Sequence, residues 1–333
     1  MNIISRVAVV GGTHGNETNG VFLARQLQRK NKKFATFETT HLIANPDAVK
    51  NNTRYVDQDL NRCFAIQNLK ESPTDIESKR AKEIDQQLGP KGQEERNVDL
   101  IIDLHNTTAN TGICLLMAPD DDICKEIAAH LYSIDNSVKV AFWAAKPRDN
   151  YAVLPSVAHR GMTFEVGPAP WGCIEPALYV QSLRLVYAAL AYIDKLNQAR
   201  GFGSPQHPLG PTQEIWLPVF TFYETIHFPR GDSDSLEVII HPNFQGRDFQ
   251  PLRLGDPIFL TLEDEQRIIH FDASIIDIVR WAGDEDGNFY PFFINEAAYY
   301  ENRIAFKLAR RDLQKVPIFG ECSGVAESVP MLG

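Results

Sequence analysis

Two histidines and a glutamate are the residues of this chain whose types and spacing suit metal chemistry. His14 and Glu17 lie three positions apart after a Gly-Gly pair, a spacing that puts both side chains on one side of a helical turn. His105 follows the apolar run at residues 100–104. Two imidazoles and one carboxylate can bind zinc and leave its fourth position open, as a catalytic zinc requires. A histidine after a glycine turn is often only a packed side chain, so the prediction depends on the residues that accompany this triplet.

A polar loop beyond residue 45 carries two arginines. Arg54 and Arg62 lie eight positions apart, and Asn61 precedes the second. A guanidinium group presents a planar fork of donors that suits a carboxylate. The alternative is an exposed loop with surface salt bridges. As a functional loop, it would hold an anionic substrate near the metal.

Carboxylates accompany the histidines at two further strand ends. Glu165 lies in an apolar run that ends in Gly-Pro. Burial would raise the pKa of this carboxyl group, which suits a general base near neutral pH; the alternative is a strand-end salt bridge. Asp103 and Asn106 flank His105 and can orient metal ligands through hydrogen bonds.

Alternating strands and helices must position these residues. Apolar runs predict strands at 7–10, 39–43, 100–104, 113–117 and 162–166, and amphipathic segments predict helices at 18–30, 75–88, 122–134 and 174–197. The alternation predicts an α/β fold with a mainly parallel sheet flanked by helices. Ligands of such sheets bind beyond the carboxyl ends of the strands, which is where His14, His105 and Glu165 lie.

A change of pattern divides the chain. Residues 200–211 contain three glycines and three prolines and predict a linker. Beyond it, short alternating runs at 214–222, 258–261, 268–271, 275–279 and 289–294 predict a β-rich region. We therefore expect a catalytic domain at residues 1–205 and a smaller β-rich domain at residues 206–333.

Composition excludes several classes of protein. The 333-residue chain has a formal net charge of −10 and no basic stripe, which argues against nucleic-acid binding. No apolar run reaches the ~18–20 residues needed to cross a bilayer, so we expect no membrane association. The five cysteines are odd in number and form no Cys-x-x-Cys pair, as is usual for reduced thiols. These features predict a cytoplasmic protein.

Six motifs in one order resemble the aspartoacylase family, which is related to aminoacylase-3 and, more distantly, to the succinylglutamate desuccinylases and zinc carboxypeptidases. Each motif alone is weak, whereas six in order between residues 6 and 305 are specific. They are Gly-Gly-Thr-His-Gly-Asn-Glu, Asn-Pro-x-Ala-Val with Thr-Arg-Tyr, Asp-Leu-Asn-Arg, Asp-Leu-His-Asn-Thr-Thr, Glu-Val-Gly-Pro and Asn-Glu-Ala-Ala-Tyr-Tyr.

The resemblance implies a zinc-carboxypeptidase-like catalytic domain and a C-terminal domain that shapes the substrate channel. It implies one Zn²⁺ per subunit and a Glu165 that activates the zinc-bound water. It implies that Arg54 polarises the scissile carbonyl, so that both Glu165 and Arg54 meet the substrate. The implied zinc ligands are His14, Glu17 and His105, and the other implied substrate contacts are Asn61, Arg62, Tyr151 and Tyr299.

The implied reaction is hydrolysis of an N-acyl amino acid, with N-acetyl-L-aspartate as the expected substrate. One position departs from the family pattern: the family has a carboxylate-binding arginine four residues after the pocket tyrosine, where this chain has Pro155. Arg148 or Arg160 would be the candidates to replace that charge, and Arg303 matches a family lysine near Tyr300. Pro155 leaves open an aminoacylase-3-like activity on N-acetylated aromatic or thioether amino acids.

The oligomeric state and two alternative classes of protein complete the predictions from the sequence. A homodimer is implied by the resemblance only. An anion-binding module without turnover and a carboxypeptidase-like activity on peptides are the other open classes. Both ligand histidines, Glu17, Arg54 and Glu165 are all present, which argues against the inactive module.

Overall fold

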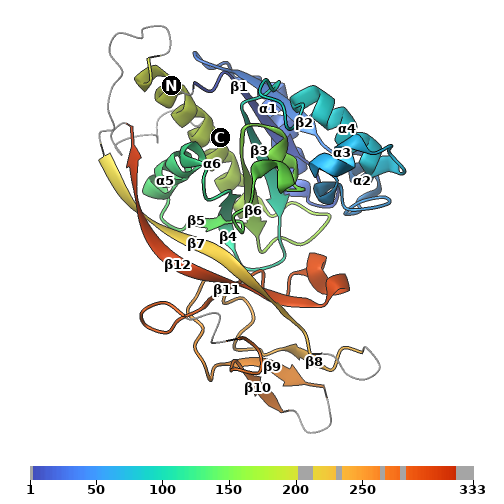
Figure 1. The fold of residues 1–333 in the computed structure, drawn as a ribbon, viewed down its shortest axis with the longest axis vertical. Coiled ribbons are helices and arrows are strands. Elements are labelled where there is room, and N and C mark those ends of the chain that lie inside the picture. Colours follow the sequence, from blue (N-terminus) through green and yellow to red (C-terminus); the bar gives the residue numbers. More distant parts are fainter. Residues whose placement is uncertain (1–2, 202–212, 230–234, 263–266, 278–282, 320–333) are drawn as a thin grey trace.

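A nine-stranded sheet runs through the molecule and joins both parts of the chain (Figure 1). The computed structural model describes residues 3–201, 213–229, 235–262, 267–277 and 283–319. The order of the strands in this sheet is β11-β12-β7-β5-β4-β6-β3-β1-β2. Their bounds are β1 (Arg6–Gly11), β2 (Glu38–Ile43), β3 (Leu100–Asn106), β4 (Gly112–Met117), β5 (Lys139–Phe142), β6 (Arg160–Gly167), β7 (Gln213–His227), β11 (Tyr290–Phe292) and β12 (Ile304–Ile318).

The strand pairing confirms the expected mixed, mainly parallel sheet. Strand β1 runs parallel to β2 and β3, β3 to β6, and β5 to both β4 and β7. The pairs β4/β6, β7/β12 and β11/β12 are antiparallel. Because β1, β3 and β6 run parallel, their carboxyl ends lie at the same edge of the sheet.

Helices cover both faces of the sheet. The described α-helices are α1 (Thr18–Lys30), α2 (Pro46–Asn51), α3 (Ile66–Lys70), α4 (Ile76–Leu88), α5 (Asp122–Ile134) and α6 (Pro176–Ala199). The short 3-10 turns are η1 (Leu60–Arg62), η2 (Arg148–Asn150), η3 (Leu154–Val157) and η4 (Ala297–Asn302). Helices α1, α5 and α6 pack on one face, and α4, η1 and η3 pack on the other. Of the helices in the described ranges, none has the length and apolarity to cross a membrane.

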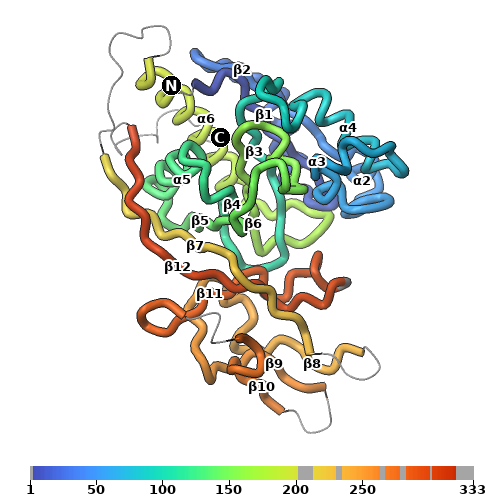
Figure 2. Tube along the Cα trace, in the orientation of Figure 1, coloured from blue at the N-terminus to red at the C-terminus, as the bar shows by residue number. Residues whose placement is uncertain are grey.

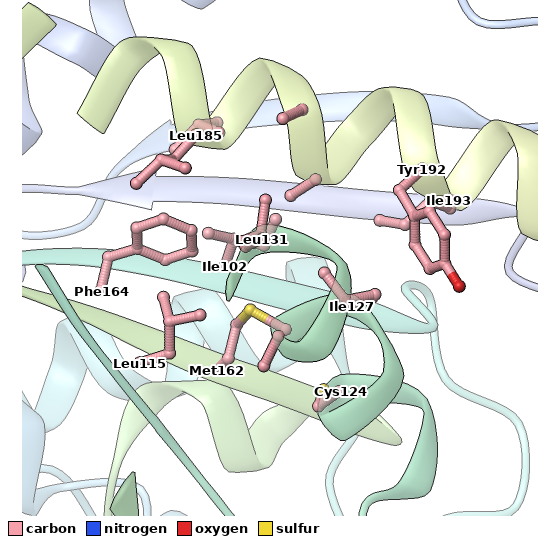
Figure 3. Packing of buried hydrophobic residues seen from close by; sticks show 14 of the residues in the cluster. Ile102, Leu115, Cys124, Ile127, Leu131, Met162, Phe164, Leu185, Tyr192 and Ile193 are labelled. Atoms are coloured by element: carbon pink, nitrogen blue, oxygen red, sulfur yellow. The ribbon is translucent and has the colours of Figure 1, made fainter. Parts of the chain in front are cut away.

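The larger core lies between the sheet and α1, α5 and α6. Ile102 on β3, Met162 and Phe164 on β6, and Leu115 on β4 point toward Leu185 of α6 and the apolar side of α5 (Figure 3). Side chains alternate between the two faces of a strand. Asp103, His105 and Glu165 therefore lie on the opposite face, toward α4, η1 and η3.

The second part of the chain contains its own apolar core and a small sheet. Strands β8 (Val238–Ile240), β9 (Pro257–Thr261) and β10 (Ile268–His270) form this sheet in the order β10-β9-β8. The expected β-rich region is thus present. Its two longest strands, β7 and β12, pair along most of their lengths and extend the main sheet, as the tube in Figure 2 shows. Both strands therefore contribute to both cores: Leu217 and Val316 lie in the larger core, and Ile226 and Phe306 lie in the core of the second part.

Several details differ from the sequence-based expectations. Residues 275–277 form a turn rather than part of a strand, and residues 278–279 lie outside the described residues. Strands β5 and β12 were not expected. The middle of β12 is partly exposed and carries charged side chains. These side chains interrupt the apolar alternation by which a strand is predicted from sequence. Most of the predicted linker and the 205/206 boundary lie in the undescribed residues 202–212, so the domain division stays a prediction.

Close packing of α1 on β3 gives the first testable prediction. A Cβ at Gly20 would lie 2.4 Å from the carbonyl oxygen of Leu104, the residue before His105. Gly20→Ala should lower the free energy of unfolding by about 1–3 kcal/mol through this overpacking. Thermal and denaturant unfolding will measure the effect. The exposed helix position Gln28 supplies the control, Gln28→Ala; equal stability of the two variants would contradict the packing argument.

Candidate active site

A tight turn between β1 and α1 positions His14 and Glu17. Glu17 is the N-cap of α1, and its amide donates to the carbonyl of His14 at 3.3 Å. The chain passes close to α2 here, because a Cβ at Gly15 would lie 2.1 Å from the carbonyl carbon of Ala48. The three-residue spacing therefore acts through a turn that precedes the helix, and not through a helix face as expected.

The structure brings His14, Glu17 and His105 together in one buried cluster. Nδ1 of His14 lies 2.7 Å from Oε1 of Glu17, and Nδ1 of His105 lies 2.9 Å from Oε2 of the same carboxylate. The two Nδ1 atoms are 3.1 Å apart. Each residue can offer one ligand atom, and these atoms lie within 4.8 Å of one another. The role of the three residues as zinc ligands remains a prediction that this geometry permits.

A carboxylate orients the outer nitrogen of each imidazole. Nε2 of His14 lies 2.9 Å from Oδ1 of Asp59, and Nε2 of His105 lies 2.8 Å from Oδ2 of Asp103. Thr13 donates its hydroxyl to the other oxygen of Asp103 at 2.8 Å. Both imidazoles therefore present Nδ1 to the cluster, in the arrangement by which a carboxylate commonly supports a metal-bound histidine.

Asp59 is a site residue that sequence reasoning did not assign. It lies in the Asp-Leu-Asn-Arg motif, in which only Asn61 and Arg62 were predicted to bind substrate. Its carboxylate accepts from His14 and also from Nη2 of Arg54 at 3.2 Å. Only the fold shows that this acid lies beside the first histidine, 45 positions earlier in the chain.

Electrostatics in the cluster favour a bound cation. Burial opposes ionisation of Glu17, but the two histidines outweigh it and hold the pKa of this carboxyl group well below its ordinary value. Burial likewise favours a neutral His105, but Asp103 and Glu17 raise its pKa well above the usual range. The carboxylates thus attract positive charge to the imidazoles. Two imidazole nitrogens and a carboxylate in such surroundings fit a zinc ion.

Arg54 lies directly beside this cluster. Its Nη1 donates to Oε1 of Glu17 at 3.2 Å, and its carbonyl accepts from the amide of Gly15 at 3.1 Å. Burial would lower the pKa of the guanidinium, but Glu17 and Asp59 outweigh burial and raise it. Arg54 is therefore a fixed positive charge at the edge of the site.

A buried glutamate that the sequence did not single out holds the Arg54 loop. Glu77 of α4 accepts from the amides of Val56, Asp57 and Gln58 at 2.7, 3.0 and 3.3 Å. It also accepts from the side chain of Asn45 at 2.9 Å. Glu77 lies near Asp57 and Asp75 in a group that resembles a second metal site by residue type. The hydrogen bonds to Glu77 account for its burial without an ion.

Glu165 lies on the strand next to His105. The two residues are Cα partners in the parallel pair β3/β6, so their side chains share the face toward η1. Removal from water raises the pKa of Glu165 to about 8, and the carboxylates of Glu17 and Glu296 act in the same direction. A carboxyl group with this pKa can take up and release a proton near neutral pH.

The predicted substrate-binding residues of the first domain lie on two loops that are joined to each other. Oδ1 of Asn61 accepts from the amide of Leu154 at 2.9 Å. The Tyr151 hydroxyl donates to the carbonyl of Ala144 at 3.0 Å, and Nη1 of the exposed Arg62 donates to the carbonyl of Asn61 at 2.9 Å. In this structure Asn61 and Tyr151 thus position loops. Their contact with substrate, and that of Arg62, stays a prediction.

The second domain reaches the site through η4. Glu296, the N-cap of η4, accepts from the amides of Thr108 and Ala109 at 2.8 and 3.1 Å and from the hydroxyl of Thr107. It thereby fixes the loop that follows His105. Tyr299 lies on the same turn, with its ring centroid 5.8 Å from that of Phe293.

The candidate replacements for the charge missing at Pro155 lie elsewhere. Arg148 donates to the carbonyls of Pro155 and Ala158 at 2.7 and 2.8 Å. Arg160 begins β6, at the opposite end of the strand from Glu165. Arg303 lines a cavity of about 370 Å³ together with Phe228, Leu236 and Tyr300. In this structure Arg148 holds the backbone beside Pro155, and Arg160 lies at the far end of β6 from Glu165; a role for either in binding substrate stays a prediction.

Comparison with known proteins agrees with this architecture. Residues 3–193 match the model of the succinylglutamate desuccinylase/aspartoacylase catalytic domain, and residues 217–276 match the barrel-sandwich hybrid domain of the same proteins. A probable aspartoacylase of Acaryochloris marina is 37% identical over 313 residues, with 93% of this chain and 97% of the relative covered.

Relatives named for two different activities have similar sequence identities to this chain. A human N-acyl-aromatic-L-amino acid amidohydrolase (carboxylate-forming) is 35% identical, with 94% of this chain and 93% of the relative covered. Mouse aspartoacylase is 34% identical, with 91% of each chain covered. The crystal structure of murine aminoacylase 3 superposes with a TM-score of 0.82 at 32% identity, over 95% of this chain and 98% of that one. The chain therefore belongs to the succinylglutamate desuccinylase/aspartoacylase family.

Proposed function

We propose that this protein is a zinc-dependent hydrolase of N-acyl amino acids, and that it converts N-acetyl-L-aspartate to acetate and L-aspartate. The observation that carries the proposal is the convergence of His14, Glu17 and His105, whose possible ligand atoms lie within 4.8 Å of one another, with Glu165 on the adjacent strand. Relatives named aspartoacylase or N-acyl-amino acid amidohydrolase support the same class of reaction.

His14, Glu17 and His105 would hold the ion. When bound, zinc supplies Lewis acidity that lowers the pKa of a water molecule and polarises an amide carbonyl. Asp59 and Asp103 keep the imidazoles oriented through their outer nitrogens. The chain would thus provide three ligands, and the fourth position of the ion would be open to water or substrate.

Glu165 is the residue proposed to move protons. It would take a proton from the attacking water and pass it to the nitrogen of the leaving amino acid. Its pKa of about 8 lies close to neutral pH, where both transfers are favourable.

Arg54 is proposed to stabilise negative charge on the carbonyl oxygen. Fixed donors of this kind act strongly because they need no reorganisation during the reaction. Asn61, Arg62, Tyr151 and Tyr299 are the proposed substrate contacts around it. Fixed cations also allow a protein with a net charge of −10 to bind an anion.

A second substrate class is favoured by one specific feature. Phe222, Phe293, Tyr299 and Trp143 pack on one apolar cluster beside the candidate site. Such a wall, together with the uncharged Pro155, suits N-acetylated aromatic or thioether amino acids. The cytoplasmic location and the dimer inferred from the sequence stay predictions.

Replacement of Glu165 tests the proposed proton transfer. Glu165→Gln should bind zinc as the parent does and should lower kcat by about 10²–10⁴-fold. Metal analysis and steady-state kinetics on N-acetyl-L-aspartate will measure both, with the exposed Glu38→Gln as the control. If Glu165→Gln hydrolyses the substrate at the parental rate, Glu165 has no role in proton transfer. If the variant loses zinc, Glu165 contributes to metal binding instead.

Replacement of the two supporting aspartates tests the proposed metal centre. Asp59→Asn and Asp103→Asn should each weaken zinc binding by about 10–100-fold, because each amide supports its histidine less well. Competition with a chromophoric chelator will measure the affinity. Asp135→Asn, at the far end of α5, should bind zinc as the parent does. Unchanged affinity in both site variants would contradict the proposed ligand orientation.

A substrate comparison tests the identity of the amino acid. The parent protein should have a higher kcat/KM for N-acetyl-L-aspartate than for N-acetyl-L-phenylalanine or N-acetyl-L-tyrosine. Removal of zinc with a chelator should abolish both activities, and zinc addition should restore them. Preference for the aromatic substrates would replace the proposed substrate while leaving the hydrolase proposal intact.

A further inference from the structure

A lysine of the second domain lies on the same face of the sheet as the candidate site. Lys307 of β12 is the Cα partner of Phe292 in β11. Phe292 packs in the apolar cluster that also includes Cys114, and Cys114 is the Cα partner of Glu165. Cα partners in a sheet share a face. The topology therefore places Lys307 and Glu165 on one face, on either side of this cluster.

Two aromatic rings hold the Lys307 ammonium. Its Nζ lies 4.7 Å from the ring centroid of Tyr299 and 5.3 Å from that of Phe222. Such cation–π contacts stabilise the ammonium in this position. Within the described part of the chain, the Lys307 ammonium forms no ion pair with a carboxylate. A half-buried cation that is held by apolar rings is well suited to receive an anion from a ligand.

Tyr299 connects Lys307 to the rest of the site. It lies on η4, and the N-cap of this turn, Glu296, accepts from the amides of Thr108 and Ala109 in the loop that follows His105. One cation, Arg54, lies beside the predicted metal ligand Glu17, and a second, Lys307, lies at Tyr299 on the turn that holds the loop after His105. A ligand with two anionic groups can meet both.

The other cations of the nearby loops have different surroundings. Lys91 donates to the carbonyls of Phe64 and Tyr151 and to the hydroxyl of Ser156, and Arg96 donates to the carbonyls of residues 156–158. Lys146 contacts the ring of Tyr151, but its side chain is exposed to solvent. Lys91 and Arg96 are thus held by backbone carbonyls and Lys146 is exposed, whereas the half-buried Lys307 contacts the rings of Tyr299 and Phe222.

We infer that Lys307 determines substrate specificity by binding a carboxylate on the substrate side chain, in addition to the α-carboxylate that other residues hold. The inference rests on the proposed function and deepens it: it favours acidic N-acyl amino acids over neutral ones. The aromatic rings position the ammonium and cover part of it. A charge-assisted hydrogen bond formed in such surroundings is stronger than one formed in water.

A pair of matched substrates tests this inference. N-acetyl-L-aspartate and N-acetyl-L-asparagine have the same size and differ in the side-chain carboxylate. Lys307→Met should raise KM for the aspartate substrate by about 10–100-fold, the loss expected for one hydrogen bond to a charged group. It should change KM for the asparagine substrate by less than about twofold, and Lys307→Arg should retain most of the preference of the parent. The control is Lys315→Met, which removes an exposed lysine elsewhere on β12 that pairs with Glu214 of β7. It should leave KM for both substrates unchanged.

Several outcomes would overturn the inference. They are equal losses for both substrates in Lys307→Met, which would indicate a structural or α-carboxylate role, and no loss for either. If the parent hydrolyses neither substrate, the proposed function fails by itself. Calorimetry then decides on Lys307: selective loss of L-aspartate binding relative to L-asparagine in Lys307→Met would support the inference. No binding by the parent, or equal binding by both proteins, would overturn it.

Discussion

The contact of one buried carboxylate with two buried imidazoles is the interaction on which this site depends. Charged groups that leave water must be paired and hydrogen-bonded, because an unpaired buried charge is strongly destabilising. Glu17 meets both His14 and His105 within 3 Å, and each histidine has a further carboxylate on its outer nitrogen. Each carboxylate in the cluster therefore has an imidazole partner, and the contacts Glu17–His105 and His14–Asp59 join segments that are distant in the chain. The turn after β1, the end of β3 and the loop at residue 59 can hardly move independently of one another.

The same physical device positions the loops around this cluster. Glu77 collects the backbone amides of residues 56–58, and Glu296 collects those of residues 108 and 109. In each case a buried carboxylate gathers amide donors that have no strand or helix partner. One of these acids comes from the first part of the chain and the other from the second. The second part is therefore a component of the site, since it fixes the loop that follows His105 and supplies Tyr299.

Local patterns in the sequence were sufficient for the elements and for most residues of the site. Helix α1 begins and ends at the expected residues, and the expected strand at 100–104 extends to Asn106, so that His105 is part of it. The motif residues His14, Glu17, Arg54, His105 and Glu165 do lie together. Asp59 and Glu77 were not recognised as parts of the site, because a carboxylate whose partner lies far along the chain has no local pattern. Strand β12 was missed because its exposed residues are charged and dilute the apolar alternation.

Local sequence was sufficient to predict the residue types of the candidate metal site, the alternation of strands and helices, and the family to which the chain belongs. These properties depend on neighbours within a few positions, and periodicity and motifs express them directly. The three-dimensional fold was needed to show which imidazole nitrogen faces the cluster, which acids support the imidazoles, and where Arg148 and Arg160 lie. The fold also places the Lys307 ammonium over the ring of Tyr299. Lys307 lies on β12, in the nine-stranded sheet that both parts of the chain build. Such relations depend on strand order and register, which arise from packing between segments that are distant in the chain.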